Sequence, residues 1–357
     1  MIVVLILNII VVALTFLESK NLFKHGLLLS FILIFIFLAI RVDYGNDYEM
    51  YYNLYRQLGK RYVDFHELKD YDDHFEIGWR YLNKIFSFLG LNFNAFLACI
   101  SLANCVVFYT IIKRYVPQDY YWLAVFLYVF NPDYMLIHLS AIRQLLAILI
   151  LLVTLPLLLS KKYVQFILLN LVSLLFHTSS MFIILLIPIS LINWKYSKVN
   201  TVLIAVSYLL LFVLSASISG FMDSVVSVFF DRYSVYTDEK GEVTTGLGFF
   251  VVFIFLSFLL LAKKNMDQSS QLLTNISIFS LLISVIGINL MMVYRLNMYF
   301  IPLLVLTLPL MVKHTEDFFQ KRFLILLIMF FYLYNFFIFF ESEIYREYYI
   351  HYQTIFN

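Results

Sequence analysis

Charged residues are scarce in this chain of 357 residues: Asp, Glu, Lys and Arg make up 13% of it, against about 25% in a typical soluble domain. Hydrophobic residues make up 62%, and the mean hydropathy is +0.87. A water-soluble globule cannot bury that much apolar surface, so the solvent must be lipid. The composition therefore excludes a large soluble catalytic domain, a nucleic-acid-binding module and a disordered scaffold.

Disulfide, metal-binding and repeat patterns are also missing. Cys99 and Cys105 lie in one apolar stretch, where their spacing on a helix prevents them from pairing. The seven His residues show no ligand spacing, so we expect no metal and no cofactor. The apolar N-terminus has no basic leader and no cleavage site, which indicates a first span. No linker or internal repeat is visible, and we predict a single membrane domain over 1–357.

The hydrophobic runs predict an all-α polytopic membrane protein with about twelve spans. Several runs are shorter than the ideal length of ~20 residues, so their ends must extend or the bilayer must thin. The runs fall at 2–17, 27–40, 93–112, 120–140, 145–159, 163–176, 180–193, 201–217, 248–262, 271–293, 298–312 and 323–340.

The loops between the runs alternate in charge. One set is short and basic and, by the positive-inside rule, cytoplasmic. The other set includes the long loops 41–92 and 219–247 and the acidic tail from Glu341, which places both termini outside. The short loops hold 13 of the 25 basic residues: Lys20, Lys24, Lys113, Arg114, Lys161, Lys162, Lys195, Lys198, Lys263, Lys264, Lys313, Lys321 and Arg322.

Acidic residues gather on the opposite side. Of the 23, 18 lie in or beside the outer segments, and apart from Asp133 the apolar runs carry no charge. Ion-coupled transporters and pumps usually carry ionisable groups near the middle of the membrane. The distribution favours chemistry or binding at the outer surface, with loops 41–92 and 219–247 forming the site face.

The first outer loop begins with a turn at Gly45-Asn46, after which a helix is predicted. Four tyrosines share one face of this helix, with Asp43 and Asp47 beside them. An interfacial tyrosine belt explains the rings alone, whereas a glycan platform explains both the rings and the carboxylates. The candidate glycan-binding residues are Tyr48, Tyr51, Tyr52 and Tyr55, together with Gln144 further along the chain.

A second amphipathic helix is predicted within Phe75 to Leu89, and it carries Glu76 and Arg80 at the i, i+4 spacing. Such a pair is often a surface ion pair of a few tenths of a kcal/mol. The alternative is that Arg80 holds substrate and leaves Glu76 to act as a base.

Further along the chain, Pro132 should kink the fourth span. Arg143 then begins the fifth span, where it either anchors the helix end or holds pyrophosphate oxygens bidentately, with Gln144 beside it. His177 in an outer turn is either a hydrogen-bonding partner or a catalyst, and Arg295 is a further cation at the same predicted level.

Several dispersed arginines thus fall on the predicted outer side. If they meet in space, they form an anion site for a lipid pyrophosphate that requires no Mg²⁺. They are Arg41, Arg80, Arg143 and Arg295, with Arg232 as an addition.

Four short motifs, in this order, resemble the EpsG family of membrane proteins from exopolysaccharide, capsule and O-antigen clusters, which are similar to Wzy-type polymerases. The match spans roughly the first half of the chain. The motifs are Arg41-x-x-x-Gly45-x-Asp47-x-x-x-Tyr51, Phe75-Glu76-x-Gly78-Trp79, Ile142-Arg143-Gln144-x-x-Ala147 and Phe176-His177-Thr178-Ser179.

The resemblance implies a C-type glycosyltransferase-like architecture with interfacial helices in the first outer loop. It also implies a polymerase that joins undecaprenyl-pyrophosphate-linked oligosaccharide units at the outer face of the bacterial inner membrane and releases undecaprenyl pyrophosphate. Its partners would be the lipid-linked donor and acceptor, the bilayer and a chain-length regulator. Arg143, Arg295, Arg41 and Arg80 would hold pyrophosphate, and the candidate bases are Glu76, Asp47, Asp43 and His177.

Two other classes of membrane protein fit the composition. A flippase for lipid-linked oligosaccharides would line a central cavity with charge and tends to show two similar halves. A membrane acyltransferase would carry a catalytic His, for which His177 or His138 is a candidate.

Overall fold

The structure is a computed structural model that describes residues 1–59, 65, 66, 68, 75–192, 197–229, 247–287 and 291–356. The chain forms two compact units, Met1–Ile183 with Tyr332–Asn357, and Ile184–Phe331. Each unit is described by itself, and the prediction of a single membrane domain stays a prediction. Part of loop 41–92, and residues 230–246 with Arg232, lie outside the described residues.

The described residues are almost entirely helical, as the hydropathy predicts. Six helices are long and apolar enough to cross a membrane, or seven if a bent pair counts as one span, and five shorter apolar helices have 10–17 residues. These segments coincide with the twelve predicted runs. The chain is thus a polytopic helical membrane protein, while twelve crossings and the C-type architecture stay predictions.

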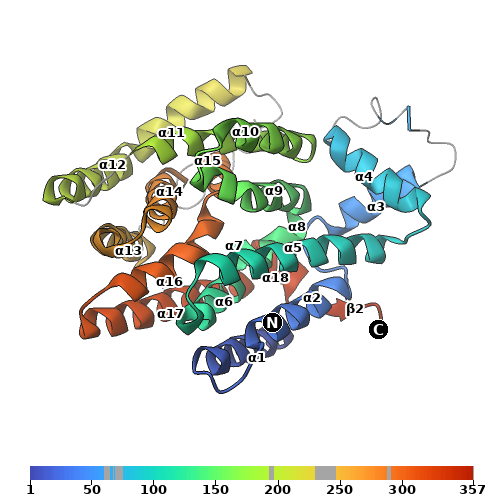
Figure 1. The fold of residues 1–357 in the computed structure, drawn as a ribbon. Coiled ribbons are helices and arrows are strands. Elements are labelled where there is room, and N and C mark those ends of the chain that lie inside the picture. Colours follow the sequence, from blue (N-terminus) through green and yellow to red (C-terminus); the bar gives the residue numbers. More distant parts are fainter. Residues whose placement is uncertain are drawn as a thin grey trace. The chain divides into compact units, whose positions relative to one another are not determined.

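In the first unit, α1 (Ile2–Ser19) and α2 (Gly26–Ala39) form an antiparallel pair (Figure 1). The Ser30 hydroxyl donates to the Val11 carbonyl at 2.8 Å, and the Leu27 amide donates to the Glu18 carboxylate at 2.5 Å. Gly26 permits the close approach, because a Cβ there would lie 2.1 Å from the Leu14 carbonyl oxygen. Although α2 is only 14 residues long, it returns the chain to the level at which α1 begins.

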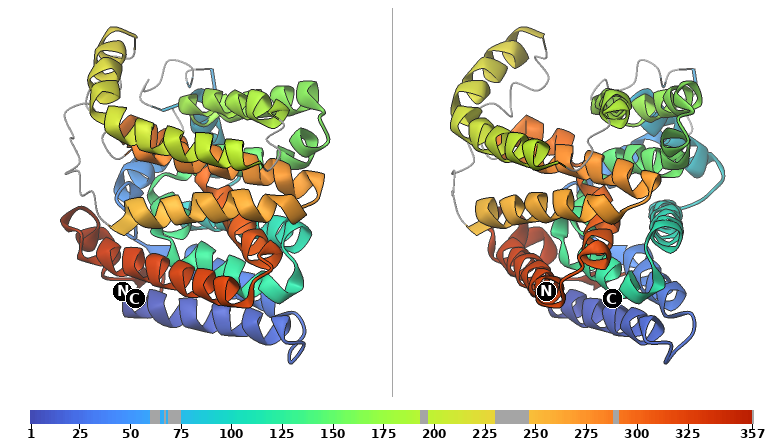
Figure 2. Two further views of the ribbon diagram at one scale, coloured as in Figure 1. Left: turned by 90° about the vertical axis from the view of Figure 1, so that its left-hand side faces the viewer. Right: turned by 60° about the vertical axis from the view of Figure 1, so that its left-hand side comes forward.

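That level is marked by a two-stranded antiparallel sheet. β1 (Arg41–Val42) pairs with β2 (Gln353–Thr354), so the start of the first outer loop is fastened to the C-terminal segment. The Met1 amine donates to the Ile350 carbonyl at 2.8 Å, and both ends of the chain lie on this side of the unit (Figure 2). We call this the site end of the first unit.

The opposite end carries the basic loops of this unit. α5 (Phe93–Tyr115) starts at the site end, where the Asn92 side chain caps it, and finishes with Lys113 and Arg114. The Gln118 amide then donates to the Glu18 carbonyl at 3.2 Å, beside the α1–α2 turn. The basic loop at Lys113 and Arg114 and the α1–α2 turn therefore lie at the end of the unit opposite the site end, in agreement with the predicted alternation of basic and acidic loops.

The predicted kink at Pro132 is confirmed. α6 (Tyr121–Phe130) ends at Asn131, and the chain continues as α7 (Pro132–Met135) and α8 (Ile137–Ser140) at 77° to it. The Asn131 side chain accepts a bond from the Asp133 amide at 3.2 Å and so begins the new helix. The chain then returns through α9 (Ile142–Leu159), α10 (Tyr163–Leu171) and the 3₁₀ segment η3 (Val172–Leu175).

Two helices of the first outer loop lie at the site end, as predicted. α3 (Tyr48–Leu58) follows Gly45, whose φ of +121° strongly favours glycine. α4 (Ile77–Phe88) begins at Glu76. The acidic tail forms α18 (Glu343–Tyr349), and its Tyr349 hydroxyl lies 2.6 Å from the Ser140 hydroxyl, against the end of the broken span.

The second unit begins with the last residues of η4 (Thr178–Leu185) and ends within α17 (Phe318–Glu341). Between them lie α11 (Leu186–Leu191), α12 (Lys198–Phe229), α13 (Leu247–Ala262), η6 (Lys263–Asn265), α14 (Gln268–Gly287), α15 (Met291–Asn297), η7 (Ile301–Leu303) and α16 (Leu304–His314). α12 continues to Phe229, into the predicted second long loop 219–247. The apolar part of this helix is Val199–Ser215, which agrees with the predicted run, and the place of the loop at the outer face stays a prediction.

Candidate active site

The candidate site is centred on Glu76, the residue before α4. Its backbone is extended, with φ −61° and ψ 147°, so the carboxylate lies beside the start of the helix. Gly78 lets this end of α4 pack against η3, because a Cβ at Gly78 would lie 2.6 Å from both Cβ and the carbonyl oxygen of Leu175. The close packing of α4 against η3, which directly precedes the fourth motif, therefore favours glycine at this position.

Arg143 is the principal partner of Glu76. Its Nη1 donates to Oε2 of Glu76, and the two side chains are 18% and 9% exposed. Arg143 lies in the first turn of α9, directly after the bend that follows the broken span. The pair is largely shielded from solvent, so its electrostatic attraction is stronger than that of a surface ion pair.

Two aromatic side chains hold the Arg143 guanidinium. It lies over the Phe75 ring, 5.0 Å from the centroid, which is cation–π geometry. Tyr51 of α3 forms a hydrogen bond with it. Burial raises the pKa of Tyr51 to about 12, although the Arg143 charge acts in the opposite direction. The first three motifs therefore meet at this guanidinium.

The fourth motif binds the other oxygen of Glu76. Both the amide and the hydroxyl of Thr178 donate to Oε1 at 3.2 Å. Nδ1 of His177 lies 3.4 Å from the same oxygen but lacks hydrogen-bond geometry. Thr178 is exposed and His177 is half-buried, so the cluster borders the protein surface.

These neighbours keep Glu76 ionised. Burial disfavours the carboxylate, but the nearby His177 and the Arg143 charge outweigh it and lower its pKa to about 2. The arrangement therefore presents a fixed carboxylate between a guanidinium and an imidazole. Such a group can orient both partners, but as long as Arg143 remains paired with it, it is a weak proton acceptor at neutral pH.

The predicted pairing of Glu76 with Arg80 is not the arrangement found. Among the described residues, the ion pairs of Glu76 are those with Arg143 and His177. Arg80 is 6% exposed within α4. The i, i+4 rule considers only one helix, and here the partners come from other elements.

The four tyrosines of α3 do not form one open platform. Tyr48, Tyr51 and Tyr55 are 8%, 1% and 6% exposed, whereas Tyr52 is 39% exposed. The Tyr55 ring stacks on Phe96 with centroids 5.5 Å apart, and its hydroxyl donates to the Leu91 carbonyl at 2.6 Å. Most of the face is therefore packed against the start of α5, and Tyr52 remains accessible.

The two carboxylates of the first motif differ in setting. Asp47 precedes α3, is half-buried and acts electrostatically on Tyr51, which links it to the Arg143 cluster. Asp43 is exposed, with a left-handed φ of 47°. Asp47 therefore belongs to the cluster, while Asp43 lies at the surface beside β1.

Arg41 makes its hydrogen bonds outside the Arg143–Glu76 pair, and its part in a pyrophosphate site stays a prediction. It is 2% exposed, and its guanidinium donates to the Leu38 carbonyl and, at 3.2 Å, to the Ser101 hydroxyl. These contacts tie the end of α2 to α5. Arg41 therefore helps to hold the start of the first outer loop.

The remaining predicted residues are less fully described. Gln144 is 4% exposed beside Arg143 in α9. Arg295 lies on α15 of the second unit, so its part in a site with Arg143 stays a prediction. In the part of the chain that the structure describes, no group of three or more His, Cys, Asp or Glu side chains is arranged to hold a metal ion.

Thr178, Phe75 and Gly78 are the site residues that sequence reasoning missed. All three lie within the quoted motifs, yet only the more obvious chemical groups beside them were chosen. Their roles depend on contacts between elements, namely two hydrogen bonds to Glu76, a ring against Arg143 and a close approach to Leu175.

A family model extends the comparison beyond the motifs. The model of the EpsG family matches residues 25–354, which include all four motifs, the whole second unit and most of the first unit. No curated protein and no solved structure matches the chain significantly.

Proposed function

Because the chain belongs to the EpsG family, a family of Wzy-like polysaccharide polymerases, we propose that it polymerises undecaprenyl-pyrophosphate-linked oligosaccharide repeat units at the outer face of the inner membrane. The observation that carries this proposal is the meeting of all four motifs at the Arg143–Glu76 pair. The basic loops at the opposite end of the first unit support the outer location.

In the proposed reaction, a hydroxyl of the acceptor unit attacks the anomeric carbon at the reducing end of the growing glycan. The bond from that carbon to the pyrophosphate oxygen breaks, and its electron pair leaves with undecaprenyl pyrophosphate. The hydroxyl proton passes to a base. Because charge develops on the leaving oxygen, a fixed guanidinium nearby lowers the barrier.

Arg143 is the proposed pyrophosphate ligand. In the structure its guanidinium is paired with Glu76, whose carboxylate oxygen stands where a phosphate oxygen of the donor would bind. The donor pyrophosphate would compete for the same donors, since a guanidinium binds phosphate oxygens in the planar, bidentate geometry that it uses for carboxylates. Phe75 and Tyr51 would keep the guanidinium in place during this exchange.

His177 is the proposed proton acceptor. Its Nδ1 lies 3.4 Å from Oε1 of Glu76, and a change in the orientation of the ring would form a hydrogen bond that directs the other ring nitrogen towards the acceptor. Glu76 would then orient the imidazole and stabilise its protonated form, as the carboxylate does in hydrolase triads. Asp47 acts within the same cluster through Tyr51.

The accessible residues around the cluster are proposed to bind glycan. Tyr52 offers an exposed ring and Asp43 an exposed carboxylate, which suit the apolar face and the hydroxyls of a sugar. Arg295 is proposed as a second pyrophosphate ligand. A metal-independent reaction, twelve spans and a chain-length regulator as partner also belong to the proposal.

The test is polymerisation by the purified protein in lipid vesicles supplied with lipid-linked repeat units. We expect a ladder of glycan lengths and release of undecaprenyl pyrophosphate. A deletion strain should accumulate single repeat units on their lipid carrier. Transport of intact units across the vesicle membrane without any ladder would favour a flippase instead and overturn the proposal.

A further inference from the structure

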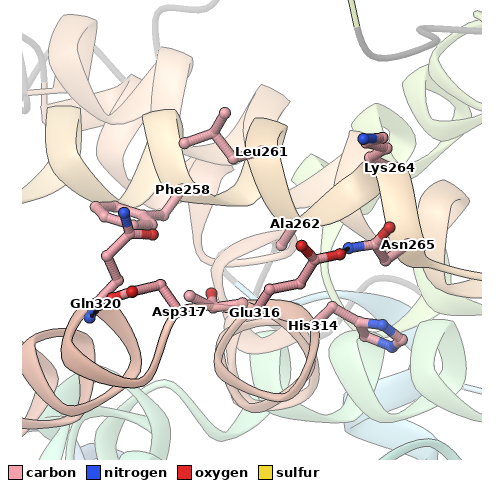
Figure 3. A pocket seen from close by; sticks show the side chains of 10 residues that line it. Phe258, Leu261, Ala262, Lys264, Asn265, His314, Glu316, Asp317 and Gln320 are labelled. Atoms are coloured by element: carbon pink, nitrogen blue, oxygen red, sulfur yellow. Dashed lines mark hydrogen bonds between the residues drawn. The ribbon is translucent and has the colours of Figure 1, made fainter.

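A cavity in the second unit lies between the termini of three helical segments. It has a volume of about 340 Å³ and is bordered by the end of α13 with η6, the end of α16 and the start of α17. Figure 3 shows the side chains around it. None of the four sequence motifs contributes to this cavity, so it is separate from the candidate active site.

The polarity of its lining changes along α13. Phe258 and Leu261 lie within the candidate span, whereas Lys264 and Asn265 follow at the end of that span. This gradient matches the boundary of a bilayer, where acyl chains give way to headgroups. The neighbouring basic loops assign this boundary to the predicted cytoplasmic side.

The cavity offers both signs of charge. Lys264 is an exposed cation, with the His314 ring at the same end of the cavity (Figure 3). Glu316 and Asp317 are exposed carboxylates. The Asn265 side chain donates to Oε1 of Glu316 at 2.9 Å, which holds this carboxylate against η6. Asp317 accepts the Gln320 amide at 2.7 Å and begins α17.

We propose that this cavity binds the phosphoethanolamine headgroup of a membrane lipid, with the phosphate beside Lys264 and His314 and the ammonium beside Glu316 and Asp317. A purely anionic headgroup would face the two carboxylates, and a cationic peptide would face Lys264. A zwitterion satisfies both sets of side chains. The apolar wall of Phe258 and Leu261 favours a lipid over soluble phosphoethanolamine. The proposal does not rest on the polymerase activity.

The lipid preference can be measured by native mass spectrometry of the detergent-solubilised protein. The protein is incubated with equal amounts of phosphatidylethanolamine, phosphatidylcholine and phosphatidylglycerol with matched acyl chains. We expect phosphatidylethanolamine to be retained roughly tenfold over the other two, because one charge-assisted hydrogen bond is worth about a factor of ten in affinity. The quaternary ammonium of phosphatidylcholine cannot donate such a bond.

Variants locate the preference in the cavity. Glu316→Gln should reduce the roughly tenfold preference to near unity, whereas Lys264→Gln should weaken the retention of all three lipids, which share the phosphate. Lys20→Gln and Glu343→Gln, which remove one charge of each sign elsewhere, should leave the preference and the retention intact. Thermal unfolding of all four variants separates loss of binding from loss of folding.

Three results would overturn the proposal. Equal retention of the three lipids would exclude headgroup recognition. A preference for phosphatidylglycerol that survives Lys264→Gln would indicate general attraction of anionic lipid to the basic loops. Soluble phosphoethanolamine that displaces the lipid at comparable concentration would exclude a lipid as the ligand.

Discussion

The candidate site of the first unit and the helix contacts of α14 in the second unit use polar side chains in different ways. In the candidate site opposite charges meet, with Glu76 held by Arg143, His177 and Thr178. On α14, apart from Asn275, which accepts from the buried Lys263, two contacts with neighbouring segments use small neutral groups. The Ser277 hydroxyl lies 2.8 Å from that of Thr307, and the Ser280 hydroxyl donates to Asn297 at 2.7 Å.

This difference suits two tasks: the charged cluster suits chemistry, and the small neutral groups suit helix association. Small hydroxyl and amide groups let membrane helices approach closely and bond across the interface, at modest energies. A buried ion pair brings a large desolvation cost and contributes little to stability over an apolar replacement. The Glu76–Arg143 pair is therefore better explained by function, and the neutral pairs by packing. Four substitutions test this contrast.

Arg143→Lys should have the largest effect. An ammonium group cannot reproduce two parallel bonds to phosphate oxygens, so we expect polymerisation to slow roughly 10²–10³-fold, a cost of about 2–4 kcal/mol in the transition state. The ladder assay in vesicles measures this. Arg114→Lys, in a basic loop, is the matched control and should keep the parental rate. A full ladder from well-expressed Arg143→Lys would make Arg143 a helix anchor.

Glu76→Gln should lower stability in a pH-dependent way, on the order of 1.5–3 kcal/mol at neutral pH. Folding lowers the pKa of Glu76 from 4.5 to about 2, so its contribution is complete above about pH 4.5 and is lost as the pH falls towards 2. We therefore expect the difference in unfolding free energy between parent and variant to shrink as the pH falls from about 4.5 towards 2. A difference that stays constant over this range would contradict the assigned pairing.

Gly78→Ala should destabilise the first unit by roughly 1–3 kcal/mol, because the added methyl group overlaps Leu175. The polymerisation rate per folded molecule should also fall, since the start of α4 carries Glu76. Gly248→Ala is the control, because a Cβ there makes only an ordinary contact, 3.8 Å from Phe331. Thermal unfolding and the ladder assay report the two effects separately. Parental values for Gly78→Ala would show that α4 tolerates displacement.

Ser280→Ala should have the smallest effect, about 0.6 kcal/mol, the average for a hydrogen bond between membrane helices. We expect the free energy of unfolding to fall by this amount while the rate per folded molecule stays unchanged. A rate loss comparable to that of Arg143→Lys would place catalysis in the second unit as well, and the contrast between the units would fail.

The parts of the fold that depend on local sequence could be predicted. Hydropathy located the apolar helices, and Pro132 marked the bend because it cannot continue the hydrogen-bond ladder of α6. Periodicity gave the shared face of the α3 tyrosines but not its surroundings. Phe93 and Phe96 of α5 cover that face, and no local pattern links the two helices.

The sequence predicted which residues belong to the site better than it predicted which of them pair with one another. Glu76, Arg143 and His177 were candidates, since charged groups next to apolar runs need a reason. Their pairing could not be predicted, because it depends on how α4, α9 and η3 pack, and Gly78 controls that packing through a contact with Leu175. For Arg41, the charge suggested a ligand site, and the structure adds a packing contact with α5 that no local pattern predicts.

The pairing of β1 with β2 also bears on the biogenesis of the protein. The Tyr44 hydroxyl donates to the carbonyl of Tyr349, 305 positions further along the chain. At 5–20 residues per second, a ribosome needs roughly 15–60 s to cover that distance. Throughout that interval β1, at the start of the first outer loop, has no β2 to pair with. A nascent chain can therefore insert most of its helices before β1 pairs with β2 beside the candidate site. A chain that terminates early would be inserted in the membrane but would lack this pairing.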